Sequence, residues 1–189
     1  MHKLDFSNFP VLYTDRLKIR QLTPEDANQI LVIRSNDVVN QFLNRPKTIR
    51  IEDAAAFIND INKKIENNES LYWAISMKNS NTLIGTTCMF NFNLEKEMAE
   101  IGYELHPDFH GKGIMNEVIS ATINYGFTEL NLKTIIALTK PENKNSISLL
   151  TKNNFLLDKD FELVNREETA DYAVYYAKSD LTEKNGTKS

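Results

Sequence analysis

The stretch His110-Gly111-Lys112-Gly113-Ile114-Met115 joins a segment with strand periodicity, residues 98–105, to a segment with helical spacing, residues 114–130. Two glycines so close together let successive backbone N–H groups turn toward one point. The N-terminus of a helix adds about half a positive elementary charge there. The stretch therefore predicts a cradle for a phosphate or pyrophosphate, although glycines in G-x-G spacing also close ordinary turns.

A compact strand is predicted at residues 134–139, shortly after this helix. Strand, glycine loop, helix and strand in this order form a βαβ unit, in which the two strands run parallel and the loop follows the C-terminal end of the first strand. The predicted anion cradle therefore lies at the carboxyl edge of a sheet.

Upstream of this unit, alternating residues predict a strand at 17–21, and Thr23-Pro24-Glu25-Asp26 opens a helix. Thr23 can cap that helix. Proline suits the first helical position because an N–H there would have no partner in the helix, and the two acidic side chains suit the positive end of the helix dipole. A second helix over 52–67 is predicted by apolar residues at near-helical spacing: Ala55, Phe57, Ile58, Ile61 and Ile65. Period-two segments predict an antiparallel meander with strands at 71–76, 82–92 and 98–105.

Downstream of the unit, the pattern predicts a short helix and a last pair of strands. The helix covers residues 143–153, and Asn154 ends it in the left-handed conformation. The strands are predicted at 155–163 and 171–177, and a polar tail follows at 179–189.

The composition, with 41% hydrophobic and 25% charged residues, is that of an ordinary globular protein. Its 189 residues show no repeat or linker, so we expect one mixed α/β (α+β-like) domain over residues 1–189, with a core at about 14–177. The 22 basic and 26 acidic side chains give a formal charge of −4, which argues against direct nucleic-acid binding. No apolar run approaches the ~20 residues that span a bilayer, so we expect a cytoplasmic protein with no membrane partner.

The reactive side chains exclude other classes of site. Cys88 is the single cysteine and lies in the apolar run 83–92, which indicates a buried structural thiol rather than a nucleophile. His2, His106 and His110 lack the spacing of a zinc site, so no metal is expected.

Four pieces of the chain, in this order, resemble the GNAT superfamily of acetyl-CoA-dependent N-acetyltransferases, in particular its RimJ/RimL-like branch of ribosomal-protein N-terminal acetyltransferases. The pieces are Thr14-Asp15-Arg16-Leu17-Lys18-Ile19-Arg20, Ala99-Glu100-Ile101-Gly102-Tyr103-Glu104-Leu105-His106-Pro107, His110-Gly111-Lys112-Gly113-Ile114-Met115-Asn116-Glu117 and Glu142-Asn143-Lys144-Asn145-Ser146, continued by Leu149 to Phe155. The resemblance implies a GNAT-type fold with a mixed, mostly antiparallel seven-stranded sheet and about four helices.

The resemblance also implies how acetyl-CoA is held. The loop His110, Gly111, Lys112, Gly113, Ile114 and Met115 would bind the CoA pyrophosphate through backbone N–H groups. Glu104 and Leu105 would present backbone groups to the pantetheine arm, which Asn143 would help to position. His110 and Met115 depart from the residues usual in the superfamily, and Met115 has to point away from the phosphate or narrow the site.

For catalysis, many superfamily members use a tyrosine in the late helix to protonate the thiolate, but Leu150 stands at that position here. The RimL-like branch implies Ser146 for this role, whereas the alternative is that Asn143 and Ser146 only cap the helix. Glu100 and Glu104 lie on one strand face and are candidate bases, with a solvated acidic face or a water chain as alternatives.

We therefore expect an N-acetyltransferase that moves acetyl from CoA to a primary amine by direct attack in a ternary complex. The resemblance implies a protein N-terminus of ribosomal type as the acceptor, and members of the branch often form homodimers. A small amine or an antibiotic is the alternative acceptor. A non-catalytic module that binds acyl-CoA is the rival from another class.

Overall fold

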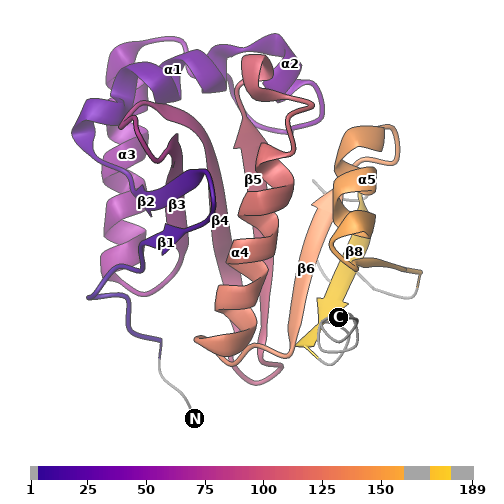
Figure 1. Cartoon of the computed structure of the whole chain (residues 1–189). Helices are drawn as coiled ribbons and strands as arrows, with labels where there is room; N and C mark the ends of the chain where they lie inside the picture. Colours follow the sequence, from indigo (N-terminus) through magenta and orange to yellow (C-terminus); the bar gives the residue numbers. More distant parts are fainter. Residues whose placement is uncertain (1–3, 160–170, 180–189) are drawn as a thin grey trace.

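The computed structural model describes residues 4–159 and 171–179 (Figure 1). The elements of this part, in chain order, are β1 (Leu12–Tyr13), β2 (Leu17–Gln21), the 3₁₀ turn η1 (Pro24–Asp26), α1 (Ala27–Ser35), α2 (Asp37–Asn40), α3 (Ile51–Glu66), β3 (Leu71–Met77), β4 (Leu83–Asn93), β5 (Met98–Leu105), η2 (Pro107–Phe109), α4 (Ile114–Thr128), β6 (Thr134–Thr139), α5 (Lys144–Lys152), β7 (Leu156–Asp158) and β8 (Ala173–Lys178).

The described strands form one sheet in the order β1-β2-β3-β4-β5-β6-β8-β7. Neighbouring strands are antiparallel except β5 and β6, which are parallel. The mixed α/β class, the meander and the βαβ unit predicted from the sequence are therefore confirmed. The sheet has eight strands rather than seven, because the two-residue strand β1 is too short to show a periodic pattern.

The predicted helices are present, with small differences at their ends. The helix expected at Thr23 begins with the 3₁₀ turn η1, and the Thr23 N–H donates to Asp26 Oδ2 at 2.9 Å. The short helix α2, of four residues, was not predicted and brings the number of described α-helices to five. Along α3 the buried residue of the first turn is Ala54 instead of Ala55. Asn154 has a φ of 63°, which confirms its left-handed conformation.

At the C-terminal end of the chain the last two strands are only partly described. Of the strand predicted at 155–163, β7 covers 156–158, and residues 160–163 lie outside the described part. The strand predicted at 171–177 is β8. The polar tail falls outside the described residues from 180 onward.

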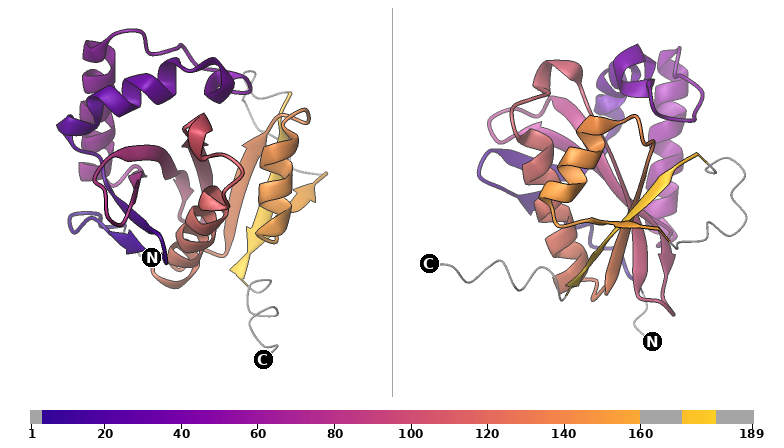
Figure 2. Two further views of the ribbon diagram at one scale, coloured as in Figure 1. Left: turned by 45° about the horizontal axis from the view of Figure 1, so that its top comes forward. Right: turned by 90° about the vertical axis from the view of Figure 1, so that its right-hand side faces the viewer.

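The sheet lies between two layers of helices (Figure 2). The helix α3 covers one face, and α4 and α5 cover the other. The core between them includes Trp73, which is fully buried and whose Nε1–H donates to the Pro10 carbonyl at 2.8 Å.

The parallel strands β5 and β6 stay paired only at their beginnings. Their register joins Met98 to Thr134, Ala99 to Ile135 and Glu100 to Ile136. Beyond Glu100, β5 continues to Leu105 and β6 to Thr139, and the two strands diverge (Figure 1). The gap between the diverging strands lies next to the glycine loop before α4 and the start of α5.

Candidate active site

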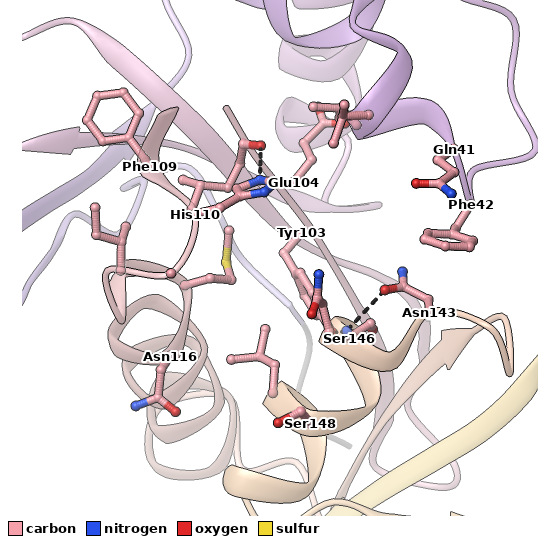
Figure 3. A pocket seen from close by; sticks show the side chains of 18 of the residues that line it. Gln41, Phe42, Tyr103, Glu104, Phe109, His110, Asn116, Asn143, Ser146 and Ser148 are labelled. Carbon is pink, nitrogen blue, oxygen red and sulfur yellow. Dashed lines mark hydrogen bonds between the residues drawn. The ribbon is translucent and has the colours of Figure 1, made fainter. Parts of the chain in front are cut away.

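A pocket with a volume of about 580 Å³ lies at the diverging ends of β5 and β6 (Figure 3). Its wall is built from the end of β5, the glycine loop, the first turn of α4, one side of α5 from its first turn to its last, and the segment of α2 and the loop after it. It brings together most of the predicted site residues: Glu104, Leu105, His110, Gly111, Gly113, Ile114, Met115, Asn143 and Ser146.

Two predicted site residues do not line this pocket. Lys112 turns back on its own loop, where its Nζ donates to the Asp108 carbonyl at 2.8 Å and lies 5.5 Å from the centre of the Phe109 ring. Glu100 lines a smaller neighbouring pocket of about 310 Å³, which shares Leu43 with the first. The two predicted carboxylates therefore belong to different parts of the site.

The glycine loop and the helix start after it contain backbone donors that have no partner among the residues that the structure describes. Gly111 and Gly113 have φ angles of 71° and 73°, a region that favours glycine. The first N–H at the start of α4 that bonds to a carbonyl is that of Glu117, which donates to Gly113 O at 3.2 Å. Within the described residues, the N–H groups of 114–116 have no acceptor, and Gly113 has no side chain to cap them. Such a helix start attracts an anion.

Arg16 and Glu117 clamp this loop from the side of β2. The carboxylate of Glu117 accepts hydrogen bonds from Thr14 Oγ1, from the Arg16 N–H at 2.9 Å and from Arg16 Nε at 2.7 Å. Arg16 Nη1 also donates to the Lys112 carbonyl at 2.9 Å. Partial burial pushes the pKa of Glu117 upward, but the hydrogen bonds from Thr14 and Arg16 outweigh it and leave this pKa below its ordinary value.

His110 ties the loop to the end of β5. Its Nε2 lies 2.9 Å from the Leu105 carbonyl oxygen, and the ring is in hydrogen-bonding position to it (Figure 3). The unusual residue at this position therefore fixes the distance between strand and loop. Met115, the other departure from the superfamily pattern, lines the pocket with only 9% of its surface exposed.

The main-chain groups of β5 alternate between its two neighbours. The His106 N–H donates to the Ile84 carbonyl on β4. Residues two apart in a strand direct their N–H and C=O groups to the same side, so the N–H and C=O of Glu104 also point toward β4. The N–H and C=O groups of Tyr103 and Leu105 point the other way, toward the gap between β5 and β6. Glu104 therefore contributes its side chain to the pocket wall, and the backbone at the gap comes from Tyr103 and Leu105.

At the start of α5, the polar residues Asn143 and Ser146 make different contacts. Asn143 Oδ1 accepts the Ser146 N–H at 3.1 Å, so Asn143 does cap the helix. The Ser146 hydroxyl is not part of this cap. Instead it lies 2.8 Å from the hydroxyl of Tyr103 on β5. Burial raises the pKa of Tyr103 to about 12.

The sequence pattern did not single out Tyr103. In the alternation of β5 it shares a face with Ile101 and Leu105, so the pattern alone does not separate it from a core residue. Leu150, at the position where the superfamily often has tyrosine, is fully buried.

On the α3 side of the pocket, Glu104 belongs to a buried polar cluster. Its Oε2 accepts from Arg45 Nη2 at 2.5 Å, and its Oε1 accepts from the hydroxyls of Thr86 at 3.2 Å and Tyr72 at 3.4 Å. Arg45 Nε in turn donates to Asn40 Oδ1 at 3.0 Å at the end of α2. Both oxygens of Glu104 are thus engaged, and the carboxylate anchors the loop after α2 to the sheet.

The neighbouring pocket contains a second buried carboxylate. Glu100 is 7% exposed, and its Oε2 accepts from Asn91 Nδ2 at 2.9 Å. Phe90 and Tyr172 form part of the same wall. Burial raises the pKa of the nearby Cys88 to about 12, so the thiol stays protonated at neutral pH, which agrees with a structural role.

Within the described ranges, no group of three or more histidine, cysteine, aspartate or glutamate side chains could hold a metal ion. Among the helices that the structure describes, none combines the length and apolar character needed to cross a bilayer.

Comparisons with known proteins agree with this architecture. The profile of the Acetyltransferase (GNAT) domain family matches residues 16–156. The uncharacterised N-acetyltransferase YoaA of Bacillus subtilis is 35% identical over 147 residues, which are 78% of this chain and 83% of that protein.

Two solved structures share the fold at low sequence identity. RimJ of Mycobacterium smegmatis in complex with CoA-disulfide has a TM-score of 0.77 at 17% identity and covers 90% of this chain and 88% of its own. RimL, a ribosomal L7/L12 alpha-N-protein acetyltransferase in complex with coenzyme A, has a TM-score of 0.76 at 18% identity and covers 89% of this chain and 98% of its own.

Proposed function

Because this chain belongs to the GNAT family of N-acetyltransferases, we propose that it binds acetyl-CoA in the pocket at the diverging strands and acetylates a primary amine there. The predicted fold family and the class of enzyme are confirmed by its membership. The observation that carries the proposal is that one pocket is lined both by residues 114–116, whose N–H groups have no acceptor in the described part of the chain, and by Ser146. A cofactor with a diphosphate at one end and a thioester at the other fits that arrangement.

The diphosphate would be held at the start of α4. Its charge would lie against the N–H groups of Ile114, Met115 and Asn116, and the helix dipole favours an anion at this end. The positive φ angles of Gly111 and Gly113 give the loop its turn. Because glycine has no side chain, neither residue blocks the approach of the diphosphate. The Arg16 guanidinium, paired with Glu117, lies behind the loop, with its Nη2 3.7 Å from the position that a Cβ of Gly113 would take.

The pantetheine arm would pass through the gap between β5 and β6, next to the main chain of Tyr103 and toward Asn143. When bound, acetyl-CoA supplies the acyl carbon that the amine attacks. Ser146 would stand beside the sulfur and donate its hydroxyl proton to the departing thiolate. Asn143 holds the helix turn that carries Ser146 through its bond to the Ser146 N–H.

The two candidate bases lie in different pockets. Both oxygens of Glu104 accept hydrogen bonds, one of them from the Arg45 guanidinium, so we assign Glu104 a role in holding the loop after α2. Glu100 is buried at the edge of the neighbouring pocket, where strands β5 and β6 begin to part. We propose that the amine enters from this side and that Glu100, directly or through water, takes up its proton.

For the acceptor, we propose the N-terminus of a protein. The support is the similarity to RimL, which is named for its action on the alpha-amino group of ribosomal L7/L12. A second support is the buried carboxylate of Glu100 in the neighbouring pocket, because a negative charge on this side suits a positively charged amine.

Two measurements test the function. Isothermal titration with acetyl-CoA should show saturable binding, and no binding at millimolar ligand would refute the proposal. Release of free thiol should then depend on an amine, with peptides bearing a free N-terminus preferred over the same peptides with a blocked N-terminus and an internal lysine. Turnover with small amines or aminoglycosides and none with peptides would replace the protein N-terminus by a small-molecule acceptor.

A further inference from the structure

The hydroxyls of Tyr103 and Ser146 come from different layers of the fold. Tyr103 lies on β5 beyond its last pair with β6, and Ser146 lies in the first turn of α5 (Figure 3). The two oxygens are 2.8 Å apart, and both residues line the pocket at the diverging strands. The contact joins the two sides of the gap at the place that the proposed function gives to the thioester.

The direction of this hydrogen bond follows from the chemistry of the two groups. The lone pairs of a phenol oxygen are partly delocalised into the ring, so a phenol is the better donor and an aliphatic hydroxyl the better acceptor. Burial keeps the Tyr103 proton in place well above neutral pH, because it raises the pKa of this group to about 12. With Tyr103 as donor, the proton of Ser146 is left to point into the pocket.

We propose that Tyr103 is a positioning residue that donates a hydrogen bond to Ser146 Oγ and so directs the Ser146 proton at the sulfur of the departing coenzyme. This inference rests on the proposed function. It assigns to a tyrosine on β5 part of the work that many superfamily members give to a tyrosine of the late helix, at the position that Leu150 occupies here.

The chemical step balances without a further reactant. The amine nitrogen forms a bond to the acyl carbon, the bond from this carbon to sulfur breaks, and sulfur keeps the electron pair. The sulfur then takes the Ser146 proton, and Ser146 recovers a proton from water. The proton that the amine loses leaves through Glu100 or water. Tyr103 keeps its own proton throughout and acts by holding Ser146 and by stabilising the oxygen while it gives up its proton.

The first test is a double-mutant cycle of Tyr103→Phe and Ser146→Ala. Tyr103→Phe removes only the hydroxyl, and we expect kcat to fall about tenfold while the KM for acetyl-CoA stays within about twofold. In the Ser146→Ala background the same change should cost less than about twofold, because the partner is already gone. Tyr125→Phe, which removes a hydroxyl from a half-buried ring on α4 outside the pocket, is the matched control.

The second test does not need turnover. The thiolate of bound CoA absorbs in the ultraviolet, so the pKa of the bound thiol can be titrated on the protein. Loss of the Tyr103 hydroxyl should raise the pKa of the bound thiol when Ser146 is present and leave it unchanged in the Ser146→Ala variant. A purely structural role for Tyr103 would shift the pKa of the thiol equally in both proteins.

The outcomes separate the inference from the function. An unchanged kcat in Tyr103→Phe, or equal losses in both backgrounds, would overturn the role of Tyr103 while the acetyltransferase proposal stands. If no amine supports turnover, the proposed reaction fails, and the thiol titration still decides on Tyr103. If CoA does not bind, both proposals are wrong.

Discussion

Arg16 and Glu117 are 101 residues apart in the sequence, and their side chains pair at 2.7 Å beside the glycine loop. The same guanidinium holds the Lys112 carbonyl, so a residue just before β2 sets the shape of a loop at the start of α4. We infer that this clamp keeps the backbone donors of the loop in place before any anion arrives.

Breaking the clamp should weaken acetyl-CoA binding more than it affects the reaction. For Arg16→Ala we expect the Kd for acetyl-CoA to rise about tenfold, equivalent to about 1.4 kcal/mol, with kcat at saturation within about twofold. The pair is partly exposed to solvent, so the loss of stability should be small. Titration calorimetry measures the effect, and Lys64→Ala, which breaks the exposed Asp60–Lys64 pair on α3, is the control. An unchanged Kd would mean that the loop holds its shape without Arg16.

A side chain and a negative charge in the cradle should abolish cofactor binding. Gly113→Glu introduces both at a residue with a φ of 73°, next to the N–H groups that would receive the diphosphate. We expect no heat of acetyl-CoA binding at concentrations that saturate the unmodified protein. Lys96→Glu, on the exposed turn between β4 and β5, makes a larger change in net charge and should bind normally. Normal binding by Gly113→Glu would move the diphosphate away from this loop.

The two glutamates of β5 should respond differently to the same substitution. Glu100→Gln should lower kcat/KM for the amine by about 10²-fold and leave the Kd for acetyl-CoA unchanged, because the base touches only the acceptor. Glu95→Gln, on an exposed turn, is the matched control. A loss below about threefold would transfer the role of base to water.

Glu104→Gln should act on stability. It leaves the Arg45 guanidinium without its carboxylate partner in a buried cluster, and we expect a loss of roughly 1–3 kcal/mol in the free energy of unfolding. Urea denaturation monitored by tryptophan fluorescence would report it. If stability is unchanged and the amine kinetics collapse instead, Glu104 takes part in the reaction.

Cys88 makes the stability of the protein sensitive to alkali. Its ordinary pKa of 9.0 is raised by burial to about 12 in the folded chain, so between these values the unfolded chain releases a proton that the folded chain retains. Stability contributed by the protonated thiol is therefore fully present below pH 9 and falls as the pH rises toward 12. In Cys88→Ala the melting temperature should fall less steeply over this range. Equal slopes for both proteins would show that the thiol does not control alkaline unfolding.

The local elements could be read from the chain because their causes are local. The glycines at 111 and 113, the cap at Thr23 and the alternation of 98–105 act through neighbouring residues, so their effect is visible in a short window of sequence. The strand β1 and the helix α2 were missed because two and four residues are too few to show a period. Membership in the GNAT family was visible for a similar reason, since it rests on short motifs in a fixed order.

Only the folded chain decided which side chains meet. Arg16 reaches Glu117, Tyr103 reaches Ser146 and Arg45 reaches Glu104 over separations of 101, 43 and 59 residues. The two glutamates of one strand face also separate, because β6 leaves β5 after Glu100 and the loop after α2 closes over Glu104. Sequence by itself determined the glycine loop and the helix that follows it, because backbone conformation depends on near neighbours. The partners of the side chains around that loop depend on strand order and crossover, and these are set by the packing of the whole core.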